Sequence, residues 1–165
     1  MKKKIKHYIK EIIVFIVIIT ILSNIISSYN ASNLNKQKLP NINLELIDGS
    51  NYTNKKAKPI LVHFWATWCP ICRLEAQNIQ TLSENFEVLS IAVKSGSVYD
   101  IQEYMNKNKL TYKVYNDEDT LLASKYNIVA YPTTFIYDKN RDLIFSEVGY
   151  TSTIGLWLRM LWASY

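Results

Sequence analysis

The sequence holds few cysteines and histidines, the side chains that most often bind zinc. Among 165 residues there are two cysteines, Cys69 and Cys72, and two histidines, His7 and His63. A structural zinc site takes about four such ligands, and His7 lies in the N-terminal tail, apart from the others. We therefore expect no metal site within one chain and no dissociable cofactor. Two cysteines separated by two residues also cannot cross-link distant segments, so their spacing points to chemistry.

The globular part of the chain lacks an excess of positive charge. The formal net charge is +5, but residues 1–30 contribute +4 of it, from five lysines and one glutamate. Residues 31–165 carry fourteen lysines or arginines against thirteen acids, a net charge of +1. Binding to nucleic-acid phosphates requires a basic surface. The charge distribution therefore argues against a nucleic acid as partner.

The chain also lacks internal repeats and low-complexity tracts, and it is too short for two domains. With 48% hydrophobic residues and only four prolines, 165 residues suffice for one domain with a substantial core. We expect residues 40–165 to form that domain. The segment 31–39 is polar, with asparagine, lysine and serine, and is predicted to link the domain to the tail.

The tail itself contains a long apolar run behind a block of lysines. The run Ile12–Ile26 is interrupted by only three polar residues. A helix needs about 20 residues to cross the hydrocarbon core, and residues 9–29 supply them if the Lys10 side chain reaches back to the headgroups. We predict that residues 1–30 form a membrane anchor that contacts the lipid bilayer through residues 9–29.

A cleaved signal peptide is the alternative interpretation of the tail. Cleavage favours small residues at the last and third-last positions, whereas candidate ends at Ser28 and Ala31 put Ile26 and Tyr29 at the third-last position. With the lysines holding the N-terminus inside, both interpretations place the rest of the chain outside the cytoplasm. We predict a single-pass protein of the cytoplasmic membrane whose domain is periplasmic or otherwise extracytoplasmic, where disulfides persist.

Beyond residue 40 the hydrophobic pattern alternates between strand and helix types. Pro59–Ala66 is almost continuously apolar, which is typical of a strand covered on both faces. Strands are expected near residues 42–46, 59–66, 88–93, 112–115, 133–137 and 143–148, and helices at 70–86, 98–105, 119–126 and after Thr151 or Ser152. This order predicts an α/β sandwich with a mixed central sheet between helices and an N-terminal hairpin.

The last helix is apolar on more than one side. Four of its residues share one face that we expect to join the core: Ile154, Trp157, Leu158 and Leu161. Leu156, Met160 and Trp162 fall elsewhere around the helix, and we expect any exposed remainder to contact the bilayer or a partner.

Cys69 falls where the central strand ends and the first long helix begins. Pro70 suits the first helical position, because the N–H that it lacks would be unpaired there. Cys69 is then the N-cap, where free N–H groups and the helix dipole favour a thiolate. We predict that Cys69 is the nucleophile and that Cys72, facing inward, resolves the mixed disulfide. A zinc half-site, two unreactive thiols and a structural disulfide are the weaker alternatives for a Cys-x-x-Cys pair at a helix start.

Three segments carry a family resemblance: F-W-A-T-W-C-P-I-C-R-L-E at residues 64–75, A-Y-P-T-T-F-I-Y-D at 130–138 and V-G-Y-T at 148–151. With them, residues 40–165 resemble the TlpA-like thioredoxin family, including its membrane-anchored ScsD-like and DsbE-like protein disulfide oxidoreductases. The resemblance implies a thioredoxin-like fold with an N-terminal hairpin and a βα insertion, here residues 97–128.

The resemblance also implies roles for residues around the cysteines. Pro132 matches the family's cis-proline and would present the Tyr131 backbone to an extended substrate segment. Tyr131 thus becomes a candidate for substrate specificity, with simple packing as the alternative. Three further candidates for contact with the substrate surround Cys69, namely Trp68, Pro70 and Ile71.

Two ionisable residues are candidates for proton transfer. Glu75 lies one turn after Cys72 on the same inward face and matches the family's C-x-x-E pattern; burial would raise its pKa and let it accept the Cys72 proton. A glutamate that turns out to solvent or pairs with a lysine is the alternative. His63 stands six residues before Cys69, where thioredoxins have a buried acid, and could relay the proton or be a hydrogen-bonded core residue.

These residues predict a protein-disulfide oxidoreductase that exchanges the Cys69–Cys72 disulfide with extracytoplasmic protein thiols. The resemblance favours a reductant supplied with electrons by a DsbD-like membrane protein. An oxidant that donates disulfides, as DsbA-like enzymes do, is the alternative activity. A copper-binding chaperone module of the Sco type is less favoured, because such proteins use a wider cysteine spacing and a histidine far downstream, and no histidine follows His63.

Overall fold

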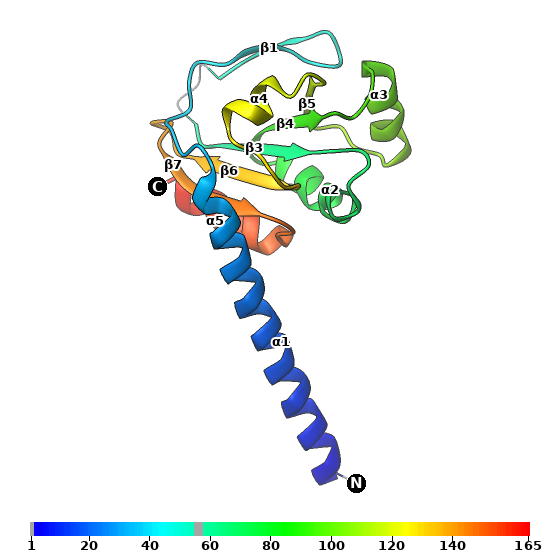
Figure 1. Ribbon diagram of the computed structural model, residues 1–165, viewed down its shortest axis with the longest axis vertical. Coiled ribbons are helices and arrows are strands. Elements are labelled where there is room, and N and C mark those ends of the chain that lie inside the picture. The colour runs from blue at the N-terminus through cyan, green and yellow to red at the C-terminus, as the bar shows by residue number, and fades with distance from the viewer. Residues whose placement is uncertain (1, 55–57) are drawn as a thin grey trace.

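A computed structural model describes residues 2–54 and 58–165. A long helix, α1 (Lys2–Asn30), projects from one end of an α/β domain (Figure 1). The segment His7–Asn33 is long and apolar enough to cross a membrane by length and composition. Within it, the large apolar side chains from Tyr8 to Ile26 are exposed, because no other part of the described chain covers them.

The domain is built on a five-stranded sheet, which is mixed as predicted. Its strand order is β5-β4-β3-β6-β7, with β3 parallel to β4, β4 parallel to β5, and β6 antiparallel to both neighbours. The strands are β3 (Ile60–Trp65), β4 (Glu87–Val93), β5 (Lys113–Asp117), β6 (Thr133–Tyr137) and β7 (Leu143–Val148). Every residue of β3 is buried, because this central strand is covered on both faces, in agreement with its continuous apolar sequence.

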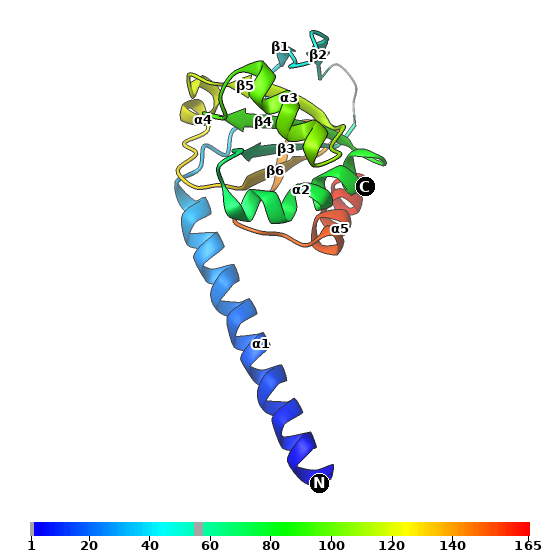
Figure 2. The same ribbon diagram turned by 90° about the vertical axis from the view of Figure 1, so that its right-hand side faces the viewer.

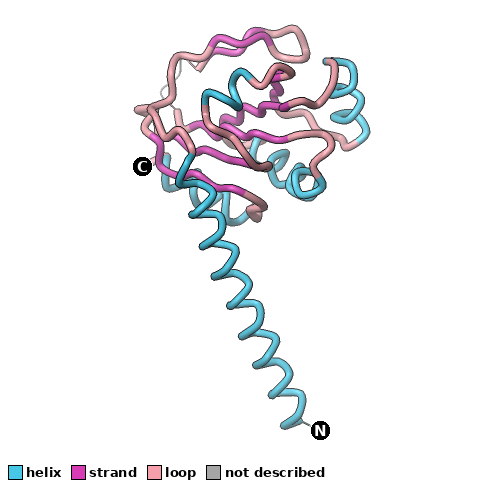
Figure 3. Tube along the Cα trace, in the orientation of Figure 1, coloured by secondary structure: helices cyan, strands magenta, loops and turns pink. Residues whose placement is uncertain are grey.

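Helices cover both faces of the sheet (Figures 2 and 3). One core cluster joins the sheet to α2 (Pro70–Ser83), α3 (Val98–Lys107) and α5 (Thr153–Ala163). A second cluster, on the other face, includes α4 (Leu121–Lys125) and the N-terminal hairpin of β1 (Asn43–Glu45) and β2 (Asn51–Thr53). The predicted insertion 97–128 holds α3, β5 and α4. The thioredoxin-like architecture expected from the sequence is confirmed.

The orientation predicted for the last helix is wrong. Ile154 and Leu158 are 73% and 61% exposed, and Trp157 is only half-buried. The inward face is formed instead by Leu156, Met160 and Ala163, which pack against α2 and the sheet. The sequence of α5 is apolar on nearly every side, so its periodicity alone does not define which side packs.

The predicted linker 31–39 does connect α1 to the rest of the domain, but it is packed and not free. A short 3-10 turn, η1 (Ala31–Asn33), follows α1, and the side chains of Ala31, Leu34 and Leu39 join the second core cluster. The Asn35 N–H donates to the Tyr126 carbonyl over 3.1 Å. The end of α1 is thereby held against the domain.

Candidate active site

The two cysteines form a disulfide at the start of α2. The chain leaves β3 at Trp65 and enters α2 at Pro70, and Cys69 is the N-cap with an extended backbone, as predicted. Cys69 and Cys72 are one helical turn apart, with their Cα atoms 5.3 Å from each other. This spacing lets the pair open and close without moving the backbone far.

The helix start favours a negative charge on Cys69 when the pair is reduced. The Cys72 N–H points at the Cys69 Sγ over 3.1 Å, and Pro70 occupies the position where an N–H would lack a partner. Cys69 is 4% exposed and Cys72 is 2% exposed. Both cysteines are therefore almost completely buried, and Cys69 is slightly the more exposed of the two residues.

A loop before β6 lies opposite the disulfide. The Tyr131–Pro132 peptide bond is cis, as the resemblance implied. The Tyr131 carbonyl oxygen is 3.7 Å from the Cys69 Sγ, and the Pro132 carbonyl accepts a hydrogen bond from the Gly149 N–H over 2.8 Å. The Tyr131 backbone is thus fixed beside the sulfur that a substrate must reach.

Glu75 is completely buried on the inward face of α2, one turn beyond Cys72. Its Oε1 accepts a hydrogen bond from the Thr151 N–H over 2.8 Å, while its Oε2 has no hydrogen-bond partner among the described residues. Desolvation raises its pKa to about 8, against the opposing effect of the Thr151 hydrogen bond, with a smaller upward contribution from Glu147. At neutral pH the carboxyl group is therefore largely protonated.

His63 faces the same interior from β3. Its Nδ1 lies 2.9 Å from the Thr134 Oγ1, and its Nε2 lies 4.0 Å from the Glu75 Oε2. Desolvation lowers the pKa of His63 to about 3, so the imidazole is neutral under ordinary conditions. The structure brings His63 and Glu75 together behind the cysteines, which sequence spacing did not show.

The outer side of the cysteine pair is apolar. Trp68 is 59% exposed, its ring meets that of Tyr131 edge to face at 5.7 Å, and its Nε1 donates to the Lys94 carbonyl over 2.9 Å. Pro70 and Ile71 are exposed beside it. Sequence reasoning missed Leu74, which is 68% exposed on the same side of α2. Its position three residues after Ile71 could have identified it.

Sequence reasoning also missed the backbone of Thr151. We considered this residue as a possible helix cap, but Ser152 caps α5 and the Thr151 N–H holds Glu75. The contact joins residues 76 positions apart in the sequence, so no local pattern could reveal it.

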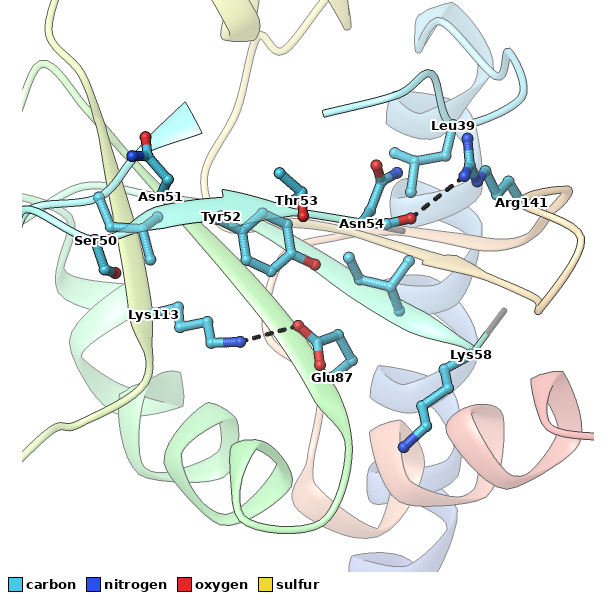
Figure 4. A pocket seen from close by; sticks show the side chains of 12 residues that line it. Leu39, Ser50, Asn51, Tyr52, Thr53, Asn54, Lys58, Glu87, Lys113 and Arg141 are labelled. Carbon is cyan, nitrogen blue, oxygen red and sulfur yellow. Dashed lines mark hydrogen bonds and ion pairs between the residues drawn. The ribbon is translucent and has the colours of Figure 1, made fainter. Parts of the chain in front are cut away.

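A pocket under the N-terminal hairpin is unrelated to the cysteines (Figure 4). It is lined by residues of the hairpin and of the sheet end beneath it, including Tyr52 and Ile60. Two of its cationic groups have partners, since Lys113 pairs with Glu87 over 3.1 Å and Arg141 contacts Asn41, while Lys58 makes no ion pair with the described residues. We interpret this pocket as the surface on which the hairpin packs. Within the part of the chain that the structure describes, no three His, Cys, Asp or Glu side chains gather to hold a metal ion.

Known proteins resemble this chain in sequence and in fold. A sequence model of the AhpC/TSA family matches residues 34–146. A thioredoxin-like protein of Haemophilus influenzae is 31% identical, over 99% of this chain and 97% of its own length. The sporulation thiol-disulfide oxidoreductase A of Bacillus subtilis is 25% identical, over 64% of this chain and 69% of its own. A secreted thiol-disulfide isomerase from Corynebacterium glutamicum has the same fold, with a TM-score of 0.68, 21% identity and coverage of 76% and 84%.

Proposed function

The chain belongs to the AhpC/TSA family of thioredoxin-like proteins and is a thiol-disulfide oxidoreductase, and on that premise we propose that it is a membrane-anchored reductant of extracytoplasmic protein disulfides. The observation that carries the proposal is the Cys69–Cys72 pair at the start of α2, facing the Tyr131–Pro132 loop and backed by the buried Glu75. The two cysteines hold the two electrons, so the reaction needs no dissociable cofactor.

The reaction follows from the positions of the two sulfurs. In the reduced protein, the Cys69 thiolate attacks one sulfur of a substrate disulfide and releases the other substrate sulfur as a thiolate, which takes a proton from water. Cys72 then loses its proton and attacks the Cys69 sulfur. The mixed disulfide breaks, the second substrate thiol leaves, and the Cys69–Cys72 disulfide forms. The substrate gains two electrons and two protons. The protein loses the two electrons and the Cys72 proton, and the second proton comes from water.

Glu75 is suited to receive the Cys72 proton. An ordinary thiol has a pKa of about 8.5, so a carboxyl group with a pKa near that value exchanges a proton with it at little cost. The structure holds the oxidised pair, and at neutral pH Glu75 carries a proton in that state, as expected after the transfer. Its Oε2 is the free position for that proton.

His63 is better suited to position Glu75 than to relay the proton. A group with a pKa of about 3 is a poor acceptor for a proton from a carboxyl group with a pKa of about 8. The imidazole is fixed by Thr134 and directs its Nε2 toward Glu75. We propose that the dipole of the neutral imidazole sets the pKa and the orientation of the Glu75 carboxyl group.

The charges near the cysteines support the direction of electron flow. Pro70 and Ile71, which lie between the cysteines, are uncharged, and the buried His63 is neutral. Arg73 follows Cys72, but its side chain is exposed, so water screens its charge. The thiolate is therefore stabilised mainly by the helix start, and a nearby ionised Glu75 would oppose it. A reduced form that is not strongly stabilised gives a low reduction potential, as in thioredoxin and unlike DsbA.

The tail and the relatives support the location. The apolar α1 and the relation to a secreted isomerase point to an extracytoplasmic thioredoxin domain. We propose that residues 9–29 cross the cytoplasmic membrane once, with the N-terminal lysines inside. A reductant in an oxidising space needs electrons from the cytoplasm, so we also propose a DsbD-like membrane protein as electron donor.

The reduction potential of the full chain in detergent micelles tests the direction. The protein would be equilibrated with thiol–disulfide buffers of stated potential and its free thiols trapped and counted. A value near that of thioredoxin, about −270 mV, is expected. A value near that of DsbA, about −120 mV, would make the protein an oxidant and overturn the proposal.

A further inference from the structure

The outer face of α5 is apolar and uncovered. Ile154, Leu158 and Trp162 recur every four residues and are 73%, 61% and 72% exposed. Leu161 and Tyr165 extend this surface toward the C-terminus. Helix α5 contains no acid, and its one charged residue, Arg159, is paired with Glu147 of β7 over 2.9 Å. An apolar surface of this kind marks a contact with a protein or a membrane.

The face lies at the end of the domain from which α1 projects. In Figure 1 the sheet runs from β5 at the far end to β7 at the end from which α1 projects, and Figure 2 shows α5 at that same end of the domain, across from the start of α1. The Arg159–Glu147 pair ties α5 to β7. Both helices therefore flank the edge strand that faces along α1.

A hydrogen bond places the end of β7 beside the end of the apolar run of α1. The Ser27 Oγ, one residue after the run Ile12–Ile26 ends, accepts a hydrogen bond from the Val148 N–H over 3.1 Å. If α1 spans the bilayer, Ser27 stands where hydrocarbon gives way to headgroups, a zone about 5–7 Å deep on each side. Val148 and the adjoining α5 then lie at that boundary.

We propose that the outer face of α5, formed by Ile154, Leu158, Leu161, Trp162 and Tyr165, rests in the headgroup region of the bilayer that α1 crosses. The inference rests on the membrane anchoring proposed above. Tryptophan and tyrosine favour this zone because their rings are apolar while their N–H and O–H groups stay hydrated. Lipid is the occupant because α1 holds this face at the membrane surface permanently, before any protein partner can arrive.

This contact would orient the active site. With β7 and α5 against the membrane, the strands lie across the direction of α1, and the end of β3 that leads to α2 points sideways (Figure 1). Cys69 would then open along the membrane surface. Partners that are themselves attached to the membrane would meet it without a change in the orientation of the domain.

Quenching of tryptophan fluorescence by brominated lipid tests the contact. The reduced full chain would be reconstituted in vesicles of phosphatidylcholine with a minor fraction of phosphatidylglycerol, with and without bromine on the upper acyl chains. No tryptophan lies in α1, so any quenching reports on the domain. The emission of Trp162 is the difference between the wild-type protein and Trp162→Phe. We expect brominated lipid to quench most of that emission. Trp157→Phe, a change on the inner side of the same helix, should leave the quenching intact.

Flotation of the same vesicles on a density gradient separates the two proposals. Protein that fails to float would overturn the anchoring itself. Protein that floats while Trp162 is not quenched would leave the anchor in place and overturn the contact of α5 with lipid. A third outcome is that bromine does not quench Trp162, while its protection from aqueous acrylamide increases with the protein-to-lipid ratio. That outcome would assign the face to a second copy of the chain and would also overturn the proposal.

Discussion

The Glu75 Oε2 lies 4.0 Å from the His63 Nε2, and both side chains are almost completely excluded from water. This distance is within the range of an ion pair, but the two groups do not form an ion pair at neutral pH. Desolvation raises the pKa of Glu75 to about 8 and lowers that of His63 to about 3, so both are neutral between these values. Both groups behind the cysteines are thus uncharged at neutral pH. The site can accept a proton only in the fraction of molecules in which Glu75 is ionised.

Cys72→Ala should trap substrates on Cys69. Without the resolving thiol, the mixed disulfide cannot break internally and accumulates. We expect protein adducts on non-reducing gels of cell extracts, released by dithiothreitol. Cys69→Ala is the matched control and should yield none, because Cys72 is 2% exposed and lies behind Cys69. Equal adducts from both variants would contradict the assigned roles, and an absence of adducts on Cys69 would count against exchange altogether.

Glu75→Gln should slow the resolution of the mixed disulfide by roughly 10²-fold, the usual effect of losing a general base. Glutamine can still accept the Thr151 hydrogen bond but cannot take the Cys72 proton. In the wild-type protein the resolution rate should rise with pH up to about 8, as Glu75 ionises, whereas in the variant the rate should follow only the ionisation of the Cys72 thiol. Rapid-quench kinetics with a peptide disulfide measures both. Glu84→Gln makes the same change at the exposed end of α2 and should leave the rate unchanged.

Glu75 should also make stability depend on pH. Its pKa is raised from 4.5 in the unfolded chain to about 8 in the folded protein, so the folded state binds more protons between these values. Stability contributed by this group is therefore complete below pH 4.5 and is lost as pH rises through 8. Each pH unit in this window changes the free energy of unfolding by about 1.4 kcal/mol at most.

Oxidised Glu75→Gln should thus gain stability relative to the wild-type protein as pH rises. Urea unfolding at pH 5 and pH 9 measures the difference in the free energy of unfolding, which we expect to grow by a few kcal/mol. His63 has a lowered pKa, so its contribution is lost as pH falls through 3, but it is present in both proteins and cancels. A difference that does not change with pH would contradict the raised pKa of Glu75.

Local sequence defined the parts of the site that depend on local structure. The apolar run before Trp65 predicted the central strand, and Cys69 followed by Pro70 predicted the N-cap, because both depend on neighbours in the chain. The helical spacing that Glu75 shares with Cys72 predicted that Glu75 faces inward. The cis bond at Pro132 required the family resemblance, since most bonds before proline are trans.

Contacts between distant segments could not be predicted in this way. The bond between Thr151 and Glu75 and the approach of His63 to Glu75 depend on how α2, β3 and the loop before α5 pack together. The inward face of α5 was assigned wrongly because apolar residues surround that helix, so both possible orientations satisfy the pattern. Its true orientation is decided by the fit of Leu156 and Met160 against the sheet, a tertiary property.

Trp68→Ala should weaken the use of protein disulfides without changing the chemistry. The exposed indole and the Tyr131 ring form an apolar surface beside Cys69, and loss of such a contact typically costs more than 1 kcal/mol, or roughly tenfold in kcat/KM. Insulin reduction measures the effect, and the reduction potential should stay near that of the wild type. Trp162→Ala removes an equally large and exposed tryptophan from α5 and should leave insulin reduction unaffected in detergent. Equal losses in both variants would contradict a specific role for Trp68.

His63→Leu should shift the pH profile of mixed-disulfide resolution upward. If the Thr134 hydroxyl donates to Nδ1, the imidazole proton lies on Nε2 and its dipole stabilises the Glu75 carboxylate 4.0 Å away. Leucine removes that dipole, so Glu75 should ionise only above its present pKa of about 8. His63→Gln keeps an N–H donor of similar reach and should restore the midpoint of the profile.

Stability alone cannot distinguish these variants, because both leave Thr134 without its buried partner and should lower the free energy of unfolding by about 1–3 kcal/mol. The midpoint of the rate profile does distinguish them. A shift in His63→Leu that His63→Gln reverses identifies His63 as the residue that positions Glu75. Unchanged midpoints in both variants would mean that His63 only packs, and that the Thr151 N–H and burial are sufficient to set the pKa of Glu75.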